Sequence, residues 1–117
     1  MADGSGDCIF CRIASGEMGT ALVAETDQVV AFDDIAPQAP VHVLVIPKRH
    51  IPSVRDLTRD DDALWGEMLA GANQVAADRG IAGSGYRLVT NTGPDSGQAV
   101  FHLHLHVMGG GKLGRLG

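Results

Sequence analysis

The sequence is poor in aromatic residues, with one Trp, one Tyr and three Phe among 117 residues, although hydrophobic residues make up 44% of the chain. The core must therefore come from Val, Leu, Ile and Ala. In such a core, a bound metal or a partner subunit adds more to stability than usual. The length fits a single domain, which we expect to span residues 1–117.

Positive charge and long apolar runs are also scarce. Nine basic residues stand against 14 acidic ones, a formal net charge of −5, whereas a nucleic-acid surface needs clustered Lys and Arg. No apolar stretch reaches membrane-spanning length, and no charged segment followed by an apolar run opens the chain. We therefore expect a cytoplasmic protein that binds neither nucleic acid nor a membrane, although local donors could still hold a single nucleotide.

Turn residues and hydrophobic periodicity divide the chain into short elements. We expect disorder in residues 1–6 and a mobile glycine-rich tail over 109–117 unless it docks. Asp7 is the expected N-cap of a short helix ending at Gly16, and Thr58 caps a long helix that ends before Gly80. Strands are predicted at 20–25, 28–33, 42–46, 86–90 and 100–108. Because strands and helices do not alternate strictly, the order favours an α+β fold with an antiparallel sheet.

The pattern with the most chemical meaning lies near the end of the chain, where His102, His104 and His106 alternate with apolar residues. On a strand, three imidazoles would then line one face at intervals of about 6.6–6.8 Å, and the intervening residues from Phe101 to Val107 would pack into the core. Neutral imidazole is a nucleophile and a metal ligand near pH 7, so neighbouring rings can divide attack, proton transfer and metal binding among them. The alternative is a polar outer face that happens to be rich in histidine.

The two cysteines form a Cys8-x-x-Cys11 motif near the start of the chain. Without a βαβ pattern beside it, a redox pair is disfavoured. Structural zinc takes four Cys or His ligands, and His50 and His102 would complete a closed Cys₂His₂ set. Zinc held there would stabilise the fold without catalysing, with an apparent binding energy of about 10–16 kcal/mol in small zinc domains. The alternative is two thiols that bind no metal.

A glycine-containing loop, residues 93–99, leads into the histidines. Gly93 and Gly97 let backbone N–H groups approach an anion, and Gln98 adds a side-chain donor. A plain hairpin connection explains the same residues about as well.

At the histidines the sequence resembles the histidine triad (HIT) family, whose signature of three histidines alternating with hydrophobic residues stands at 102–108. The sequence also resembles the Hint branch of this family, which includes purine nucleoside phosphoramidases, at residues 31–35, 37–40, 42–50 and 97–100. The resemblance runs from about Cys8 to Gly110. It implies one HIT-like domain, a five-stranded antiparallel sheet with one long and one short helix, whose sheet joins that of a second copy in a homodimer.

The resemblance also implies roles for single residues in a purine nucleoside monophosphate pocket. His104 would be the nucleophile that forms a nucleotidyl-histidine intermediate, His106 would contact the phosphate or leaving group, and His42 would support them. Asp34 would bind the ribose hydroxyls. The base would be walled by Ile9, Phe10, Phe32 and Leu44, and the phosphate would be surrounded by Asn91, Gly97, Gln98, Ala99 and Val100. Zinc-bearing members have metal ligands that match Cys8, Cys11, His50 and His102.

Simpler explanations exist for six of these residues: core packing for Phe10, Phe32 and Leu44, turns for Asp34 and Asn91, and a hydrogen-bonded core position for His42. The sequence also departs from the family. Ala99 stands where many relatives carry a Ser that bonds the phosphate, and the loss of one hydrogen bond to a charged group typically costs about 1.5–3 kcal/mol. Asp33 replaces a His found in some relatives, and the tail lacks the aromatic ending of the animal branch.

Together these features predict a hydrolase that cleaves the P–N bond of purine nucleoside 5′-phosphoramidates. One alternative is a dinucleoside polyphosphate hydrolase, which applies the same chemistry to a P–O–P bond. Another is a nucleotide-binding dimer without turnover, which the Ala99 substitution keeps open.

Overall fold

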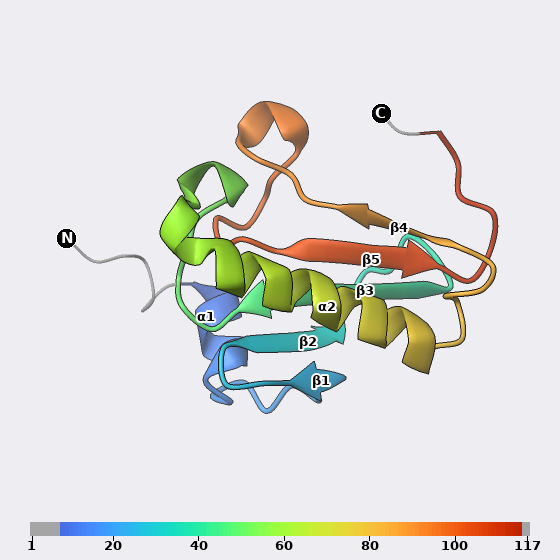
Figure 1. Ribbon diagram of the computed structural model, residues 1–117, viewed down its shortest axis with the longest axis horizontal. Helices are drawn as coiled ribbons and strands as arrows, with labels where there is room; N and C mark the ends of the chain where they lie inside the picture. The colour runs from blue at the N-terminus through green and yellow to red at the C-terminus, as the bar shows by residue number, and fades with distance from the viewer. Residues whose placement is uncertain (1–7, 116–117) are drawn as a thin grey trace.

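The computed structural model describes residues 8–115. The expected disorder of residues 1–6 and the last two residues of the tail lie outside this range. The expected Asp7 cap is wrong, because the short helix begins at Ile9 and its N-cap is Cys8, whose Sγ accepts from the Cys11 N–H. The elements, shown in Figure 1, are in chain order α1 (Ile9–Ala14), β1 (Ala24–Glu25), β2 (Val29–Asp33), β3 (Val41–Pro47), the 3-10 helices η1 (Val54–Asp56) and η2 (Arg59–Asp61), α2 (Asp62–Asp78), β4 (Tyr86–Val89), the 3-10 helix η3 (Pro94–Ser96) and β5 (Leu105–Gly109).

The five strands form one antiparallel sheet in the order β1-β2-β3-β5-β4. The long helix α2 crosses one face of this sheet, and the short helix α1 packs against the other face (Figure 1). The central strand β3 is buried on both sides: Val43 and Val45 belong to the core under α2, whereas Leu44 and Ile46 belong to the core beside α1. The expected α+β fold and the buried strand at 42–46 are confirmed.

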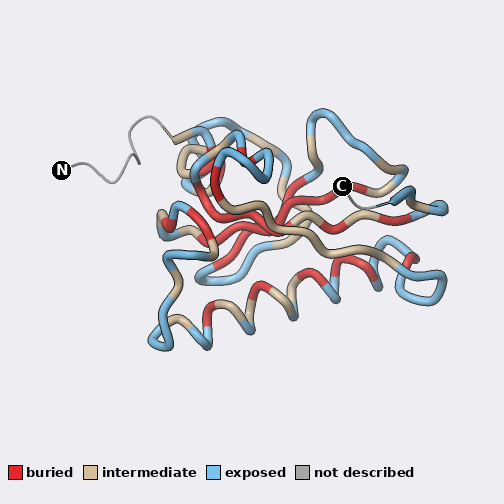
Figure 2. The backbone as a smooth tube through the Cα atoms, turned by 90° about the horizontal axis from the view of Figure 1, so that it is seen from above, coloured by how far each residue is buried: buried red, intermediate tan, exposed pale blue. Residues whose placement is uncertain are grey.

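The long helix follows the expected pattern closely. Thr58 does act as a cap, but it caps η2, which leads directly into α2 at Asp62. The helix ends at Asp78, and Gly80 follows with a φ of +73°, a left-handed conformation that glycine adopts without strain. The buried residues of α2 recur on the side of the helix that faces the sheet (Figure 2), namely Leu64, Met68, Ala72, Val75 and Ala76.

The last strand is shorter than expected. A strand over 100–108 is wrong for its first half, because β5 begins at Leu105 and pairs with β3 and β4. In this register the β3 residue that would face Leu103 is Pro47, which has no N–H to donate. Leu103 instead donates its backbone N–H to the carbonyl oxygen of Ile51, beyond the end of β3, at 2.6 Å. Phe101, expected in the core, lies outside the strand and is 52% exposed.

The remaining strands are close to the predicted ones, except at the start of the sheet. The segment 20–25 forms a strand only at Ala24–Glu25, while β2 and β4 fall within one residue of the expected bounds. None of the helices in residues 8–115 is long and apolar enough to cross a membrane.

Candidate active site

The three alternating histidines lie together on the side of the sheet that faces α1. His106 is on β5, whereas His102 and His104 sit in the extended segment just before it. The His104 and His106 rings are 5.0 Å apart between centroids, and the Phe10 ring of α1 lies 5.1 Å from His104 and 6.0 Å from His102. Side chains still alternate through this segment, because Leu103, Leu105 and Val107 pack on the opposite side under α2.

His104 is held so that one ring nitrogen remains available. Its Nδ1 lies 2.7 Å from the carbonyl oxygen of His102, and because a carbonyl only accepts, Nδ1 carries the proton. Burial lowers the pKa of His104 below the usual 6.5, although the bond to His102 and the charge of Asp34 oppose this effect. The ring is therefore neutral at pH 7, with a lone pair on Nε2, which is the state a nucleophile needs.

A chain of hydrogen bonds also fixes the protons of His42 and His106. The backbone N–H of Gln38 donates to Nδ1 of His42 at 2.9 Å, so the His42 proton is on Nε2. That N–H donates to Nδ1 of His106 at 2.8 Å, which leaves the His106 proton on its own Nε2. Burial, with smaller effects of His104 and His42, lowers the pKa of His106 to about 4. His106 is thus a neutral N–H donor beside His104.

Asp34 lies in a turn and faces the histidines, while its expected contact with the ribose stays a prediction. One carboxylate oxygen accepts from the backbone N–H of Ala36 at 2.9 Å, as in a turn, and the other lies 3.4 Å from Nε2 of His42. The next residue, Ile35, is apolar but 99% exposed.

An apolar wall borders the histidines. Phe10, Phe32 and Leu44 are buried in one cluster, with the two Phe rings edge to face at 5.6 Å, and Ile9 on α1 is 37% exposed. The core explanation for the three buried residues therefore holds, and among them Phe10 contacts the His102 and His104 rings while Leu44 is the strand partner of His106.

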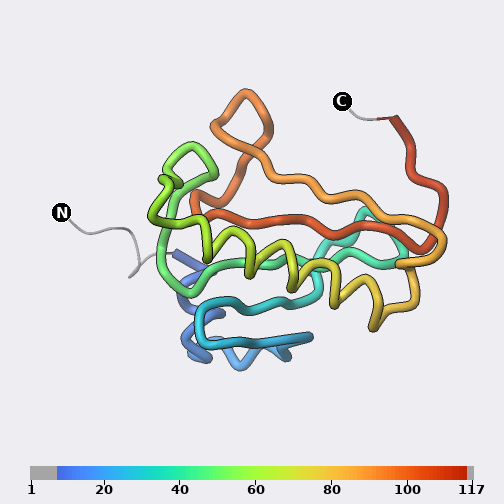
Figure 3. The backbone as a smooth tube through the Cα atoms, viewed as in Figure 1, coloured from blue at the N-terminus to red at the C-terminus, as the bar shows by residue number. Residues whose placement is uncertain are grey.

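The loop that leads into the histidines is shaped by the Gln98 side chain. Its amide oxygen accepts from the Gly93 N–H at 2.8 Å, and its amide nitrogen donates to the carbonyl oxygens of Pro52 at 2.7 Å and Val100 at 3.1 Å. The residue is 5% exposed. Gln98 thus ties the segment after β3 to the segment after β4, which lie at the same end of the sheet (Figure 3). Both of its donors are engaged within the chain.

The other residues expected at the phosphate lie in this loop or close to it in sequence. Gly97 has a φ of +92°, a conformation that favours glycine, and ends η3. Asn91 is half-buried, Ala99 is exposed, and Val100 packs partly against the apolar wall. The structure therefore places all the residues expected around the phosphate in one segment between β4 and His102.

The four expected metal ligands converge at the N-terminus of α1. Nδ1 of His102 lies 3.3 Å from Sγ of Cys8 and 3.4 Å from Sγ of Cys11, and Nδ1 of His50 lies 3.2 Å from Sγ of Cys11. All four ligand atoms lie within 4.8 Å of one another, and no disulfide joins the cysteines. Tetrahedral zinc would separate sulfur and nitrogen ligands by about 3.6 Å, so the donor set and its spacing fit this ion.

The His102 ring also has the outer contact expected of a metal ligand. Its Nε2 donates to the carbonyl oxygen of Pro47 at 2.8 Å, which leaves Nδ1 without a proton and aimed at the thiols. Burial is the main cause that lowers the pKa of His102 to about 4, so the ring is neutral.

Known proteins resemble the chain over nearly its whole length. The family described as "Scavenger mRNA decapping enzyme C-term binding" matches residues 7–114. An uncharacterized HIT-like protein of Synechocystis is 52% identical over 104 residues, covering 89% of this chain and 90% of its own. The purine nucleoside phosphoramidase of Escherichia coli K12 is 43% identical over 108 residues, which are 92% of this chain and 91% of that protein. A solved HIT family hydrolase from Clostridium thermocellum superposes with a TM-score of 0.90 at 44% identity, over 94% of this chain and 96% of that one.

The sheet, the histidines and these matches define a hydrolase of the HIT type, and the chain belongs to the histidine triad family. Within the family, the similarity to the Escherichia coli protein supports the Hint-like branch. The family and the fold expected from the sequence are thereby confirmed.

Proposed function

We propose that the chain hydrolyses the P–N bond of purine nucleoside 5′-phosphoramidates to a nucleoside monophosphate and an amine. The observation that carries this proposal is the pairing of a neutral His104, with its Nδ1 proton held by a carbonyl, and a neutral His106 with its proton on Nε2. The name of the Escherichia coli relative supports the choice of bond.

The chemistry takes two steps on the chain's own residues. In the first, Nε2 of His104 attacks phosphorus and the P–N bond breaks, while the departing nitrogen accepts a hydrogen bond from the Nε2–H of His106, takes a proton from water and leaves as the amine. In the second, the hydroxide formed from that water attacks the phosphorus, and the bond to His104 breaks, which restores the neutral ring. His42 supports His106 because its Nε2–H donates to Nδ1 of that ring.

Binding of the nucleotide is assigned to the surrounding residues. Asp34 accepts hydrogen bonds from the ribose, and the apolar wall of Ile9, Phe10, Phe32 and Leu44 contacts the base. Asn91 and the backbone N–H groups of Ala99 and Val100 lie at the phosphate and stabilise its developing charge, whereas the N–H groups of Gly97 and Gln98 donate to the carbonyl oxygens of Pro94 and Gly93. Ala99 offers only its backbone there, because its side chain has no donor.

The test is release of nucleoside monophosphate from adenosine 5′-phosphoramidate by the wild type and by His104→Ala. We expect release to disappear in the variant while binding of adenosine monophosphate survives, since His104 attacks but does not hold the base. Diadenosine polyphosphates serve as the comparison substrates. A wild type that binds the nucleotide but cleaves none of them would refute the proposed hydrolysis.

We also propose that Cys8, Cys11, His50 and His102 bind one structural Zn²⁺. A closed set of four protein ligands leaves no coordination position for water, so the metal would stabilise the fold rather than react. Reduced, metal-binding thiols also suit the cytoplasm, where we place the protein. Elemental analysis should find about one zinc per chain. A folded, metal-free protein from zinc-supplemented expression would contradict the assignment.

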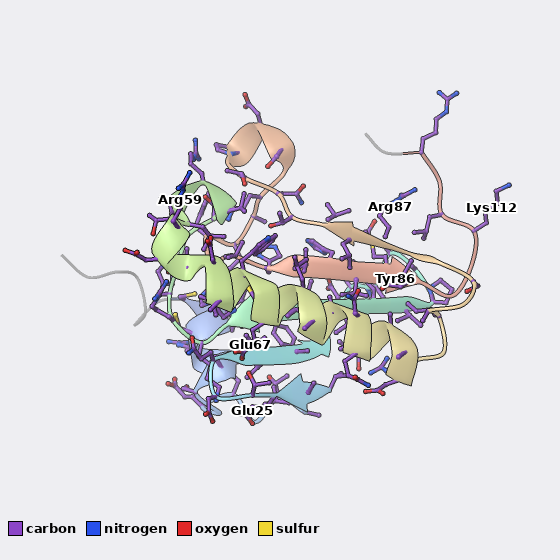
Figure 4. All side chains as sticks on the ribbon, in the orientation of Figure 1. Glu25, Arg59, Glu67, Tyr86, Arg87 and Lys112 are labelled. Atoms are coloured by element: carbon purple, nitrogen blue, oxygen red, sulfur yellow. The ribbon has the colours of Figure 1, made fainter. Side chains whose placement is uncertain are left out.

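Finally, we propose a homodimer that joins two sheets through β4. This strand pairs with β5 on one side and forms an edge on the other, where unpaired backbone groups are able to accept a second strand. Tyr86 and Arg87, labelled in Figure 4, mark this edge. Light scattering should give twice the chain mass at micromolar concentration, and a monomer there would contradict the proposal.

A further inference from the structure

His102 belongs to two groups at once. Its ring nitrogen Nδ1 lies among the thiols of Cys8 and Cys11, at 3.3 and 3.4 Å. Its carbonyl oxygen accepts the Nδ1 proton of His104 at 2.7 Å. The same residue therefore joins the Cys/His cluster to the ring assigned as nucleophile.

A second connection runs through α1. Phe10 lies between the two cysteines in sequence, and its ring meets the His104 ring nearly at right angles, with centroids 5.1 Å apart. It also contacts Phe32, at 5.6 Å, and is 8% exposed. Phe10 therefore packs against the side of the His104 ring and lies on the helix that contains Cys11 and is capped by Cys8.

The helix α1 is too short to hold this position by itself. It has six residues, and isolated helices of this length are not stable in water. Its contacts to the rest of the chain include the thiols of Cys8 and Cys11 at the cluster and the apolar side chains of Phe10, Ile13 and Ala14. Fixing the two thiols would therefore hold the helix more firmly and, with it, the Phe10 ring.

We propose that Phe10 is a positioning residue that couples the Cys/His cluster to catalysis: a metal bound by the cluster fixes α1, and α1 holds the Phe10 ring against the imidazole of His104. This inference rests on the proposed nucleophilic role of His104. Because a displacement of about 1 Å at a reacting group can cost about a hundredfold in rate, loss of the metal should lower kcat by at least about tenfold. The effect on nucleotide affinity should be smaller.

The first measurement does not depend on activity. Proton NMR of the zinc-loaded protein should show cross-relaxation between the Phe10 ring and the ring protons of His104, and chelation of zinc should weaken it while the core signals of α2 persist. Unchanged cross-relaxation in a protein shown to be metal-free would overturn the proposal. So would a folded protein that never binds zinc.

The second measurement compares turnover of adenosine 5′-phosphoramidate with and without zinc in three forms: wild type, Phe10→Leu and Ile13→Ala. Ile13 is the matched control, because it is buried on the same helix without a ring contact to His104. We expect chelation to lower kcat in the wild type and in Ile13→Ala, but to change little in Phe10→Leu, whose kcat is already reduced with zinc bound. Equal losses in all three forms would overturn the coupling.

The KM values separate this role from a contact with the base. If Phe10 only walls the base, Phe10→Leu raises KM and leaves kcat unchanged, which also overturns the inference. If chelation unfolds the chain, His50→Ala replaces it as the perturbation, because His50 contacts the cluster through Cys11 and lies outside α1. A wild type without turnover would refute the proposed function, and the NMR measurement would still decide the coupling.

Discussion

Replacement of Gln98 by Ala should destabilise the protein more than it impairs nucleotide binding. The side chain makes three hydrogen bonds at a buried position, to the Gly93 N–H and to the carbonyl oxygens of Pro52 and Val100. Each such bond contributes about 0.5–1.5 kcal/mol net, so Gln98→Ala should lower the free energy of unfolding by about 2–4 kcal/mol. The loop before His102 would lose its tie to the segment after β3.

Urea denaturation gives the stability change, and kinetics with adenosine 5′-phosphoramidate gives the functional one. Gln98→Glu is the matched variant: it keeps an acceptor for the Gly93 N–H but loses both donors. We expect both variants to be destabilised, with Gln98→Glu also placing charge beside two carbonyl oxygens. A loss in kcat/KM with unchanged unfolding would refute the reasoning, since it would mean that the amide serves the substrate rather than the fold.

Two further outcomes follow from the site and the core. The pKa of His104 is lowered and that of His106 is about 4, so kcat/KM should stay constant as the pH is lowered past 6.5 and fall only where these rings gain protons. A fall in kcat/KM at or above pH 6.5 would contradict the neutral state assigned to the two rings. Gly109→Ala should cost about 1–3 kcal/mol in urea unfolding, since a Cβ there would lie 2.8 Å from Cδ1 of the buried Ile81 and 3.1 Å from the backbone oxygen of Gly85. Gly66→Ala should instead be neutral or stabilising by up to about 1 kcal/mol, because Gly66 lies in α2 and a Cβ there would have no atom within 4 Å. Equal losses of stability at both sites would argue against the packing explanation.

Local patterns predicted the parts of this structure that depend on neighbours in sequence. The helical spacing of Leu64, Met68 and Val75 gave the buried face of α2, and the apolar run at 42–46 gave the buried central strand. The alternation of the histidines correctly put them on one side, even though two of them lie outside the strand. The order of the elements favoured the antiparallel sheet, and the family resemblance implied the same five-stranded arrangement.

What the sequence left open depends on contacts between distant segments. The start of β5 is set by Pro47, more than 50 positions earlier, so a continuous alternating pattern over 100–108 overestimated the strand and misplaced Phe101. The partners of the Gln98 amide, on Gly93 and Pro52, appear only once two loops meet. The tautomer of His42 depends on a backbone N–H of Gln38, which no side-chain pattern reveals.

The division of the core by the sheet has a consequence for how the sequence is able to change. The cluster under α2 is the larger one and lies away from the imidazoles, whereas the smaller cluster beside α1 contains residues that touch them. Volume-conserving substitutions under α2 can therefore accumulate, or be selected for thermal resistance, without altering the reactive rings. On the α1 side a substitution of Phe10 changes the packing and the contact with His104 together, so this part of the core has less freedom to change.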